Sequence, residues 1–183
     1  MLIRNHTQDF QLKISSKGDI MIARITGTLI FTILANAGNA HAQVRTVRDI
    51  PTALAVEAVS AAVEDCSSKG YSVSAAVVDR SGQLKALQRA DNAGPHTIET
   101  SRRKAYTSLS LKTSTAKLME ITQKNPAAAN LVYIPDFMVL GGGLPIQLEG
   151  EIIGAIGIGG APGGHLDEQC AEAGIARIKD RLK

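Results

Sequence analysis

The sequence predicts an α+β domain in which helices pack on an antiparallel sheet. Three observations support this class: apolar residues recur at helical spacing, β-rich segments occur in pairs, and the turns that join each pair are only two or three residues long. Connections this short can join antiparallel strands, whereas parallel strands need a long crossover. The predicted element order is α-β-β-α-α-β-β-β-α.

The first predicted helix begins at Pro51 and ends before Gly70. Proline is favoured at the first position of a helix, and glycine is common just after its last residue. Apolar residues recur at spacings of three and four, which is the pattern of one buried helical face. These residues are Leu54, Ala58, Val59, Ala62, Val63 and Cys66.

Three further helices are expected. One runs from about Thr97 to Leu109, and a second runs from Ser114 to Lys124 with Thr113 or Ser114 as its N-cap. The last helix opens with Asp167 and Glu168, whose negative charges complement a helix N-terminus.

The strands are expected as two groups around tight turns. Ser72–Val78 and Gln83–Arg89 form a hairpin, and the first of them is apolar at consecutive positions, as in a central strand covered on both faces. Residues 125–135 are expected to be irregular, with room for a helical turn. Phe137–Leu140 is expected to be a short strand, and two more strands flank the turn Glu149-Gly150.

The first 42 residues are interpreted as material outside the domain. Residues 21–42 resemble a secretory signal peptide, with Arg24, an apolar run and Ala40-His41-Ala42 as the cleavage site. The apolar run is shorter than the roughly 20 residues that cross a membrane, which disfavours an uncleaved anchor. Residues 1–20 are interpreted as an over-extended start or a disordered lead. The expected domain is residues 43–183, in a periplasmic or secreted protein without stable membrane insertion.

The composition disfavours nucleic-acid binding. The whole chain has a formal net charge of +3, and much of that excess lies in the first 42 residues. The chain has three Tyr, three Phe and no Trp, so a platform of stacking aromatic residues is not expected.

Cys66 and Cys170 are the two cysteines of the chain. Export to an oxidising compartment permits a disulfide without requiring one. The prediction favours two buried free thiols that pack as small hydrophobic groups, with a disulfide as the alternative.

Two sequence blocks carry a family signature. The first block, Val73–Leu118, contains the motif VVD-x-x-G-x-L, a loop near Asp91 and a helix with the sequence KAYTS. The second block, Gly141–Ile178, contains two apolar strands, a glycine-rich loop and the terminal helix. Together they resemble the GlcG/HbpS-like family, also called haem-degrading domain proteins, over Ile50–Lys179. Two departures are visible: Asn92 stands in place of a usual glycine, and Gly159 in place of a common serine.

The resemblance implies a profilin/roadblock-like arrangement, haem as the ligand, and a homo-oligomer, with octamers among the family members. The implied function is an exported haem-binding protein that serves haem uptake, buffering or sensing. Slow haem degradation that uses the iron of the haem itself is an enzymatic alternative, so the question of catalysis stays open. Another alternative is an accessory binding module for a different small organic ligand or a corrinoid, without catalysis.

His96 and His165 are the candidate metal ligands. They are the only histidines in residues 43–183, and each stands in a glycine- and proline-containing loop at the start of a helix. Neutral imidazole is a common ligand of haem iron and of transition metals. The alternative is that each histidine is a surface residue or a helix cap.

Further candidate ligand contacts follow His96 on the same helix. Arg102 and Arg103 could bind the propionates of haem, because arginine pairs with carboxylates through two parallel hydrogen bonds. Tyr106 could ligate ferric iron or could simply be packed with its hydroxyl satisfied. Arg102, Arg103 and Lys104 form a basic run, but neighbouring residues on a helix point about 100° apart, so at most one or two of them can face the same ligand. The alternative for this run is a solvated helical face.

Two other groups are given less weight. The glycines from Gly157 to Gly164 could hold an anion at a helix N-terminus, but Asp167 and Glu168 already supply negative charge there. Asp79 and Asp91 stand at turn positions, where aspartate favours local backbone hydrogen bonds, so a hydrolase is not expected.

Overall fold

The computed structural model describes residues 44–183, and Thr46–Lys183 form one compact unit. The predicted lead and signal peptide lie outside the described residues. Within the described part of the chain, none of the helices has both the length and the apolar character needed to span a bilayer.

The predicted α+β class is confirmed. The elements in chain order are α2 (Thr52–Ser68), β1 (Ser74–Asp79), β2 (Leu84–Arg89), α3 (Thr97–Leu111), α4 (Thr115–Lys124), the 3₁₀ helix η1 (Pro126–Tyr133), β3 (Gly143–Leu148), β4 (Glu151–Gly159), α5 (Gly164–Ile178) and the 3₁₀ helix η2 (Lys179–Arg181). The Ser114 hydroxyl caps α4 by accepting a hydrogen bond from the Lys117 N–H at 3.2 Å.

One predicted strand does not form. Phe137–Leu140 is irregular because its backbone groups are bound by side chains of α3 rather than by a neighbouring strand. The Met138 N–H donates to the Thr107 hydroxyl at 2.7 Å, and the Arg103 guanidinium donates to the Phe137 carbonyl at 2.6 Å. The segment therefore runs along α3 and leaves a four-stranded sheet.

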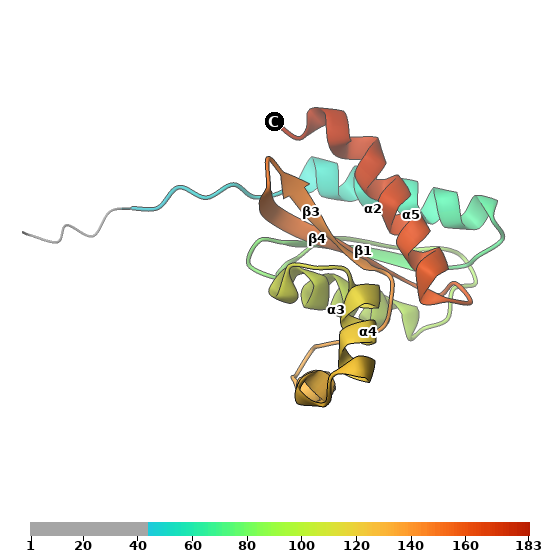
Figure 1. The fold of residues 1–183 in the computed structure, drawn as a ribbon. Helices are drawn as coiled ribbons and strands as arrows, with labels where there is room; N and C mark the ends of the chain where they lie inside the picture. Colours follow the sequence, from blue (N-terminus) through green and yellow to red (C-terminus); the bar gives the residue numbers. More distant parts are fainter. Residues whose placement is uncertain (1–43) are drawn as a thin grey trace, which may run out of the picture. The chain divides into compact units, whose positions relative to one another are not determined.

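The sheet lies between two helical layers (Figure 1). Its strand order is β2-β1-β4-β3, and every neighbouring pair is antiparallel. Helices α2 and α5 cover one face, whereas α3 covers the other and α4 and η1 extend beyond it. In β1, Ala75 and Val77 join the core cluster with α2 and α5, while Val78 packs against Ala105 of α3. The central strand predicted from the apolar run is confirmed.

Glycine in β4 lets α3 approach the sheet closely. A Cβ atom added to Gly157 would lie 2.1 Å from the Ser101 carbonyl oxygen and 2.5 Å from the Ala105 nitrogen, both in the α3 backbone. Only a residue without a side chain fits there. The short distance between α3 and β4 brings the start of α3 beside the loop that follows β4.

The turns agree with the sequence. Glu149 and Gly150 both have positive φ, at 50° and 82°, as a two-residue hairpin turn requires. Asn92 adopts φ 64°, a conformation that asparagine tolerates well. The Asp79 carboxylate accepts hydrogen bonds from the N–H groups of Ser81 and Gln83, both at 2.9 Å, which is the local turn role expected for it.

The cysteines form a disulfide, so the prediction of two buried free thiols was wrong. Cys66 at the end of α2 and Cys170 in α5 are bonded, with their Cα atoms 5.5 Å apart, and both residues are fully buried. The family resemblance already implied that the two terminal helices lie side by side, which made a bridge possible. The prediction failed because the sequence does not show that Cys66 and Cys170 face each other across these helices at bonding distance.

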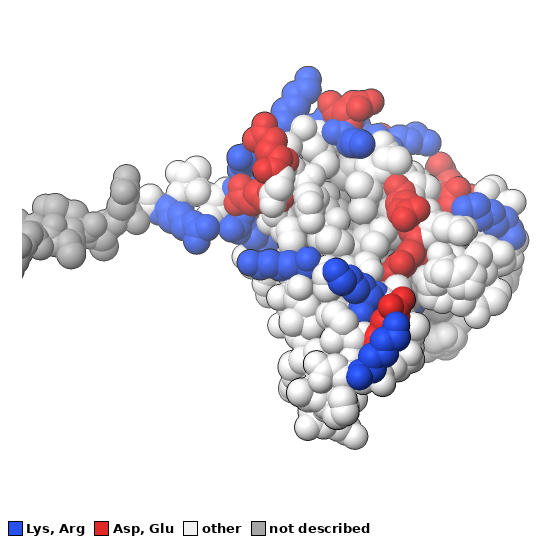
Figure 2. Space-filling view, in the orientation of Figure 1, with Lys and Arg blue, Asp and Glu red and all other residues white. Residues whose placement is uncertain are grey.

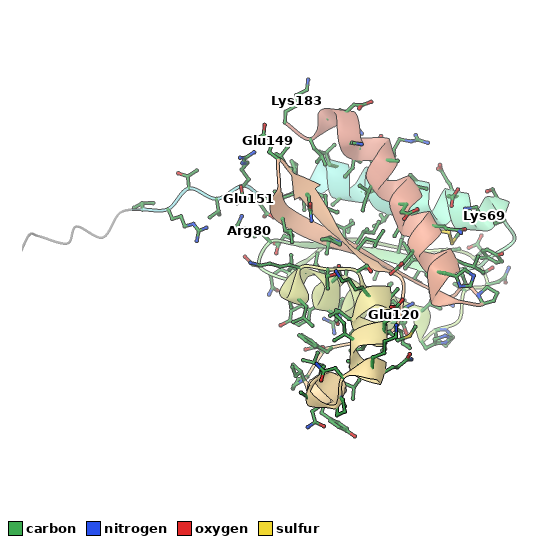
Figure 3. All side chains as sticks on the ribbon, viewed as in Figure 1. Lys69, Arg80, Glu120, Glu149, Glu151 and Lys183 are labelled. Carbon is green, nitrogen blue, oxygen red and sulfur yellow. A yellow bond between two sulfur atoms is a disulfide. The ribbon has the colours of Figure 1, made fainter. Side chains whose placement is uncertain are left out.

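The visible surface mixes both signs of charge. In Figure 2, basic and acidic side chains are interspersed over the body of the domain and over α4, whereas the end formed by η1 is uncharged. Arg48, Arg80, Glu149 and Glu151 form ion pairs near the β3–β4 turn, where Figure 3 labels three of them. No broad basic surface suited to nucleic acid is visible on this face.

Candidate functional site

A pocket of about 580 Å³ lies where the start of α3, the helix α4 and the glycine-rich loop before α5 meet. We call it the two-histidine pocket, because both histidines of the described chain line it. Its lining residues are His96, Thr100, Lys104, Ala116, Met119, Glu120, Leu140, Gly141, Gly160, Ala161, Pro162, Gly163, Gly164, His165 and Asp167. Pockets that bind small molecules commonly have volumes in this range.

The two histidines have the same local setting. Each imidazole lies against the glycine two residues earlier: a Cβ on Gly94 would be 2.7 Å from Cε1 of His96, and one on Gly163 would be 2.8 Å from Cε1 of His165. Both histidines are exposed at the pocket mouth. Their imidazoles are therefore accessible to a ligand, and the missing glycine side chains leave room for the rings.

An ion pair lies at the inner side of the pocket. Lys104 of α3 donates to Asp167 of α5 with an Nζ–Oδ2 distance of 2.7 Å, and their side chains are only 4% and 3% exposed. The other Asp167 oxygen accepts from the Ala161 N–H at 3.1 Å. Burial raises the pKa of the Asp167 carboxyl above its usual range, although Lys104 and the Ala161 N–H act in the opposite direction.

The remaining wall combines apolar and acidic groups. Ala116, Met119 and Leu140 supply apolar surface, and Leu140 is 49% exposed. Glu120 on α4 lines the pocket and is labelled in Figure 3. An apolar wall with a few polar groups can hold a flat, largely apolar molecule that carries charged substituents.

The structure does not bring Arg102 into the pocket. Its guanidinium binds Asp136 at 2.6 Å and Glu99 at 3.0 Å, on the outer side of α3. These partners raise the pKa of Arg102, and Arg102 in turn lowers the pKa of Asp136. Arg102 thus holds the segment before Phe137 against α3.

Arg103 and Tyr106 also lie outside the two-histidine pocket. Arg103 binds the Phe137 carbonyl at 2.6 Å. Tyr106 packs edge-on against Phe137 with ring centroids 6.2 Å apart, and it lines a separate pocket of about 410 Å³ with Arg80 and Lys112. Residues 96, 100 and 104 share one face of α3, so residues 102 and 106 point elsewhere. Arg103 is kept out of the pocket by its hydrogen bond to the Phe137 carbonyl.

Sequence reasoning missed several residues of the pocket, chiefly Thr100, Met119, Glu120 and Asp167. It considered Lys104 only as part of the basic run with Arg102 and Arg103, and of these three Lys104 is the one that lines the pocket. A signal for Thr100 and Lys104 was present, because they follow His96 at intervals of four along α3. Asp167 was assigned to the helix N-terminus alone. No local pattern shows that Lys104 would be its partner, because the two residues lie on helices on opposite faces of the sheet.

The described residues contain no group of three or more His, Cys, Asp or Glu side chains able to hold a bare metal ion. The groups that line the pocket are two imidazoles, an apolar wall and a buried ion pair. This arrangement is typical of a protein that binds a small organic molecule, and a metal within that molecule could take the imidazoles as ligands.

The chain belongs to the HbpS-like family, described as haem-degrading proteins, which it matches over residues 50–176. It is 34% identical to protein GlcG of Escherichia coli K12 over 100 residues, which cover 55% of this chain and 73% of GlcG.

Solved structures show the same fold. A double mutant of HbpS from Streptomyces reticuli superposes with a TM-score of 0.69 and 36% identity, covering 76% of this chain and 96% of that chain. A complex of PduOC with haem superposes with a TM-score of 0.64 and 25% identity, covering 71% and 95% of the two chains. The description of the family and this complex both name haem as the molecule concerned.

Proposed function

We propose that this protein binds haem in the two-histidine pocket. The observation that carries the proposal is that His96 and His165, from opposite ends of the family signature, line the same pocket. The complex of a related structure with haem supports the ligand class.

The residues present fit haem. Imidazole is a usual protein ligand of haem iron, so His96 and His165 would hold the haem. Haem iron does not need the group of three or more protein ligands that a bare metal ion would need and that the described residues lack. Ala116, Met119 and Leu140 provide apolar contact for the ring. Bound haem would supply a redox-active iron, while the chain binds it, orients it and limits its contact with water.

A haemin titration tests the proposal. The wild type is compared with His96→Ala, His165→Ala and the double variant, with Tyr106→Phe as a control in the separate pocket. We expect a shifted Soret band in the wild type and at least about a 10-fold weaker affinity for each histidine variant, since loss of a metal-supporting group commonly costs that much. Equal affinity in the double variant and the wild type would refute the site.

We propose that the protein is exported and acts outside the cytoplasm, in haem uptake, buffering or sensing. The signal-peptide pattern of residues 21–42 supports export. The Cys66–Cys170 disulfide also supports it, because structural disulfides persist mainly in oxidising compartments. Intact-mass measurement of the protein from cell fractions checks this: we expect a mass that begins at Gln43, found outside the cytoplasm.

Slow haem degradation is the second candidate, favoured by the description of the family as haem-degrading. The chain would contribute binding and orientation, since redox chemistry belongs to the haem iron. The measurement is the loss of haem absorbance together with released iron and a defined tetrapyrrole product. Bleaching at the same rate with albumin would exclude catalysis. Mass spectrometry of molecules that co-purify with the protein would detect a corrinoid or another organic ligand instead.

We also propose a homo-oligomer. The end formed by α4 and η1 carries exposed apolar side chains, including Val132 at 48%, Tyr133 at 80% and Ile134 at 40%, and η1 has no buried residue. Apolar surface of this kind is typical of contacts between protein chains. Light scattering is expected to give a multiple of the subunit mass for the wild type and a smaller mass for Tyr133→Glu. A monomeric wild type would refute this proposal.

A further inference from the structure

The Lys104–Asp167 ion pair differs from the surface pairs of this protein in its burial. Its side chains are 4% and 3% exposed, whereas Arg80 and Glu151 pair with 26% and 31% exposure. Removing two charges from water is costly, and a well-packed apolar pair is often at least as stable. Stability alone therefore does not explain why lysine and aspartate occupy these positions.

The pair connects the two elements that carry the histidines. Lys104 lies two helical turns after His96, on the same face of α3 that lines the pocket. Asp167 lies two residues after His165, in the first turn of α5. A single ion pair thus joins the His96 helix to the His165 helix at the inner side of the pocket.

Asp167 also holds the loop that leads to His165. Its Oδ1 atom accepts from the Ala161 N–H at 3.1 Å while its Oδ2 atom accepts from Lys104 at 2.7 Å. The glycine-rich loop between β4 and α5 is therefore attached, through this carboxylate, to α3.

The surroundings leave the pair little freedom. A Cβ atom added to Gly142 would lie 2.7 Å from Asp167 Cβ and 2.8 Å from Lys104 Nζ. A Cβ on Gly164 would lie 2.7 Å from the Gly141 Cα. The backbone at Gly142 therefore packs directly against both partners, and the backbone at Gly141 packs against the start of α5.

We propose that Lys104 and Asp167 are a positioning pair that sets the placement of His96 relative to His165, so that both imidazoles bind one haem. The inference rests on the proposed haem function. Neither residue needs to touch the iron: the pair acts through the helix starts that carry the histidines.

The test uses haem-loaded protein with its disulfide intact. Lys104→Met removes the charge and keeps the length of the side chain, and Lys104→Met/Asp167→Met removes both charges. Lys117→Met, an exposed lysine on α4, is the matched control. His96→Ala and His165→Ala supply the reference spectra for haem with one imidazole.

The readout is the coordination state of the iron in the visible spectrum. We expect a six-coordinate, low-spin spectrum for the wild type and the Lys117 control, and spectra like those of the single-histidine variants for Lys104→Met and for the double variant. If Lys104→Met does not fold, the double variant decides, because it leaves no unpaired buried charge. A merely stabilising pair would allow the folded double variant to keep the wild-type spectrum, and that result would overturn the inference.

A second measurement separates this inference from the proposed function. If the wild type binds no haem, the proposed function fails, and hydrogen exchange of the Ala161 amide in the ligand-free protein then tests the positioning role. We expect that amide to exchange at least about 10-fold faster in Lys104→Met, because its Asp167 acceptor loses its anchor. An unchanged exchange rate would overturn the inference.

Discussion

Removal of the Cys66–Cys170 disulfide is expected to lower the stability of the domain strongly. The bond joins residues separated by 104 positions, so in the unfolded chain it closes a loop of about that length. Chain-entropy arguments assign about 4.7 kcal/mol to a loop of 100 residues. A domain of this size is typically stable by only about 5–15 kcal/mol, so the loss is a large fraction of the total.

Both cysteines are fully buried in the cluster that α2 and α5 form with the sheet. We expect the surrounding apolar packing to be kept in Cys66→Ala/Cys170→Ala, because alanine is also small and apolar. The effect should therefore arise mainly from the unfolded state. In a thermal melt, about 4.7 kcal/mol corresponds to a decrease in Tm of about 15–20 °C for a domain near this length.

The assay compares urea unfolding of the oxidised wild type with that of Cys66→Ala/Cys170→Ala. Reductant should destabilise the wild type and leave the double variant unchanged, which controls for other effects of the reagent. A free energy of unfolding that is equal for the two proteins within about 1 kcal/mol would refute the loop-closure argument. Two reactive thiols in the denatured, unreduced wild type would show that the bond is absent.

Three further outcomes are expected. Lys104→Met should cost about 3–5 kcal/mol at neutral pH by leaving Asp167 buried and unpaired. Loss of Lys104 should also raise the pKa of Asp167 further, which carboxyl NMR can measure. Because the protonated carboxyl carries no unpaired charge, the loss of stability caused by Lys104→Met should shrink as pH falls. A loss of stability that stays constant with pH would contradict this. Gly94→Ala should weaken haem binding with little change in Tm, because the nearest atoms to the added Cβ all belong to the His96 ring. Equal haem affinity in the variant and the wild type would argue against contact of that ring with the ligand. Gly157→Ala should destabilise the fold by more than about 2 kcal/mol in urea unfolding, because the added Cβ would overlap the α3 backbone. An unfolding midpoint equal to that of the wild type would show that α3 can move away.

The elements of the fold followed from local patterns. Thr97 begins α3 as predicted, Ser114 caps α4, and the Glu149-Gly150 turn joins β3 to β4. Each of these depends on a few neighbouring residues: a cap, an apolar spacing or a positive φ. The prediction of a strand at Phe137–Leu140 was wrong for the opposite reason: the backbone of this segment binds the side chains of Thr107 and Arg103, which are distant in the sequence.

The candidate site was predicted only in part. The similar loop settings of His96 and His165 could be recognised in the sequence, but the sequence did not show that they line one pocket. Arg102 and Tyr106 are close to His96 along the chain and yet point away from it, because 100° per residue turns them to other faces of α3.

The sequence by itself determined the family, the α+β class and most element boundaries, because these depend on motifs and spacings within short segments. The start of the last helix was an exception: α5 begins at Gly164 and not at the predicted Asp167. Only the tertiary structure decided which distant residues meet: Cys66 with Cys170, and Lys104 with Asp167. The physical reason is the antiparallel pairing of β1 with β4 at the centre of the sheet. It places α2, which precedes β1, beside α5, which follows β4, on one face, while α3 covers the other face. Contacts between those helices depend on the packing of the whole chain, which no local pattern records.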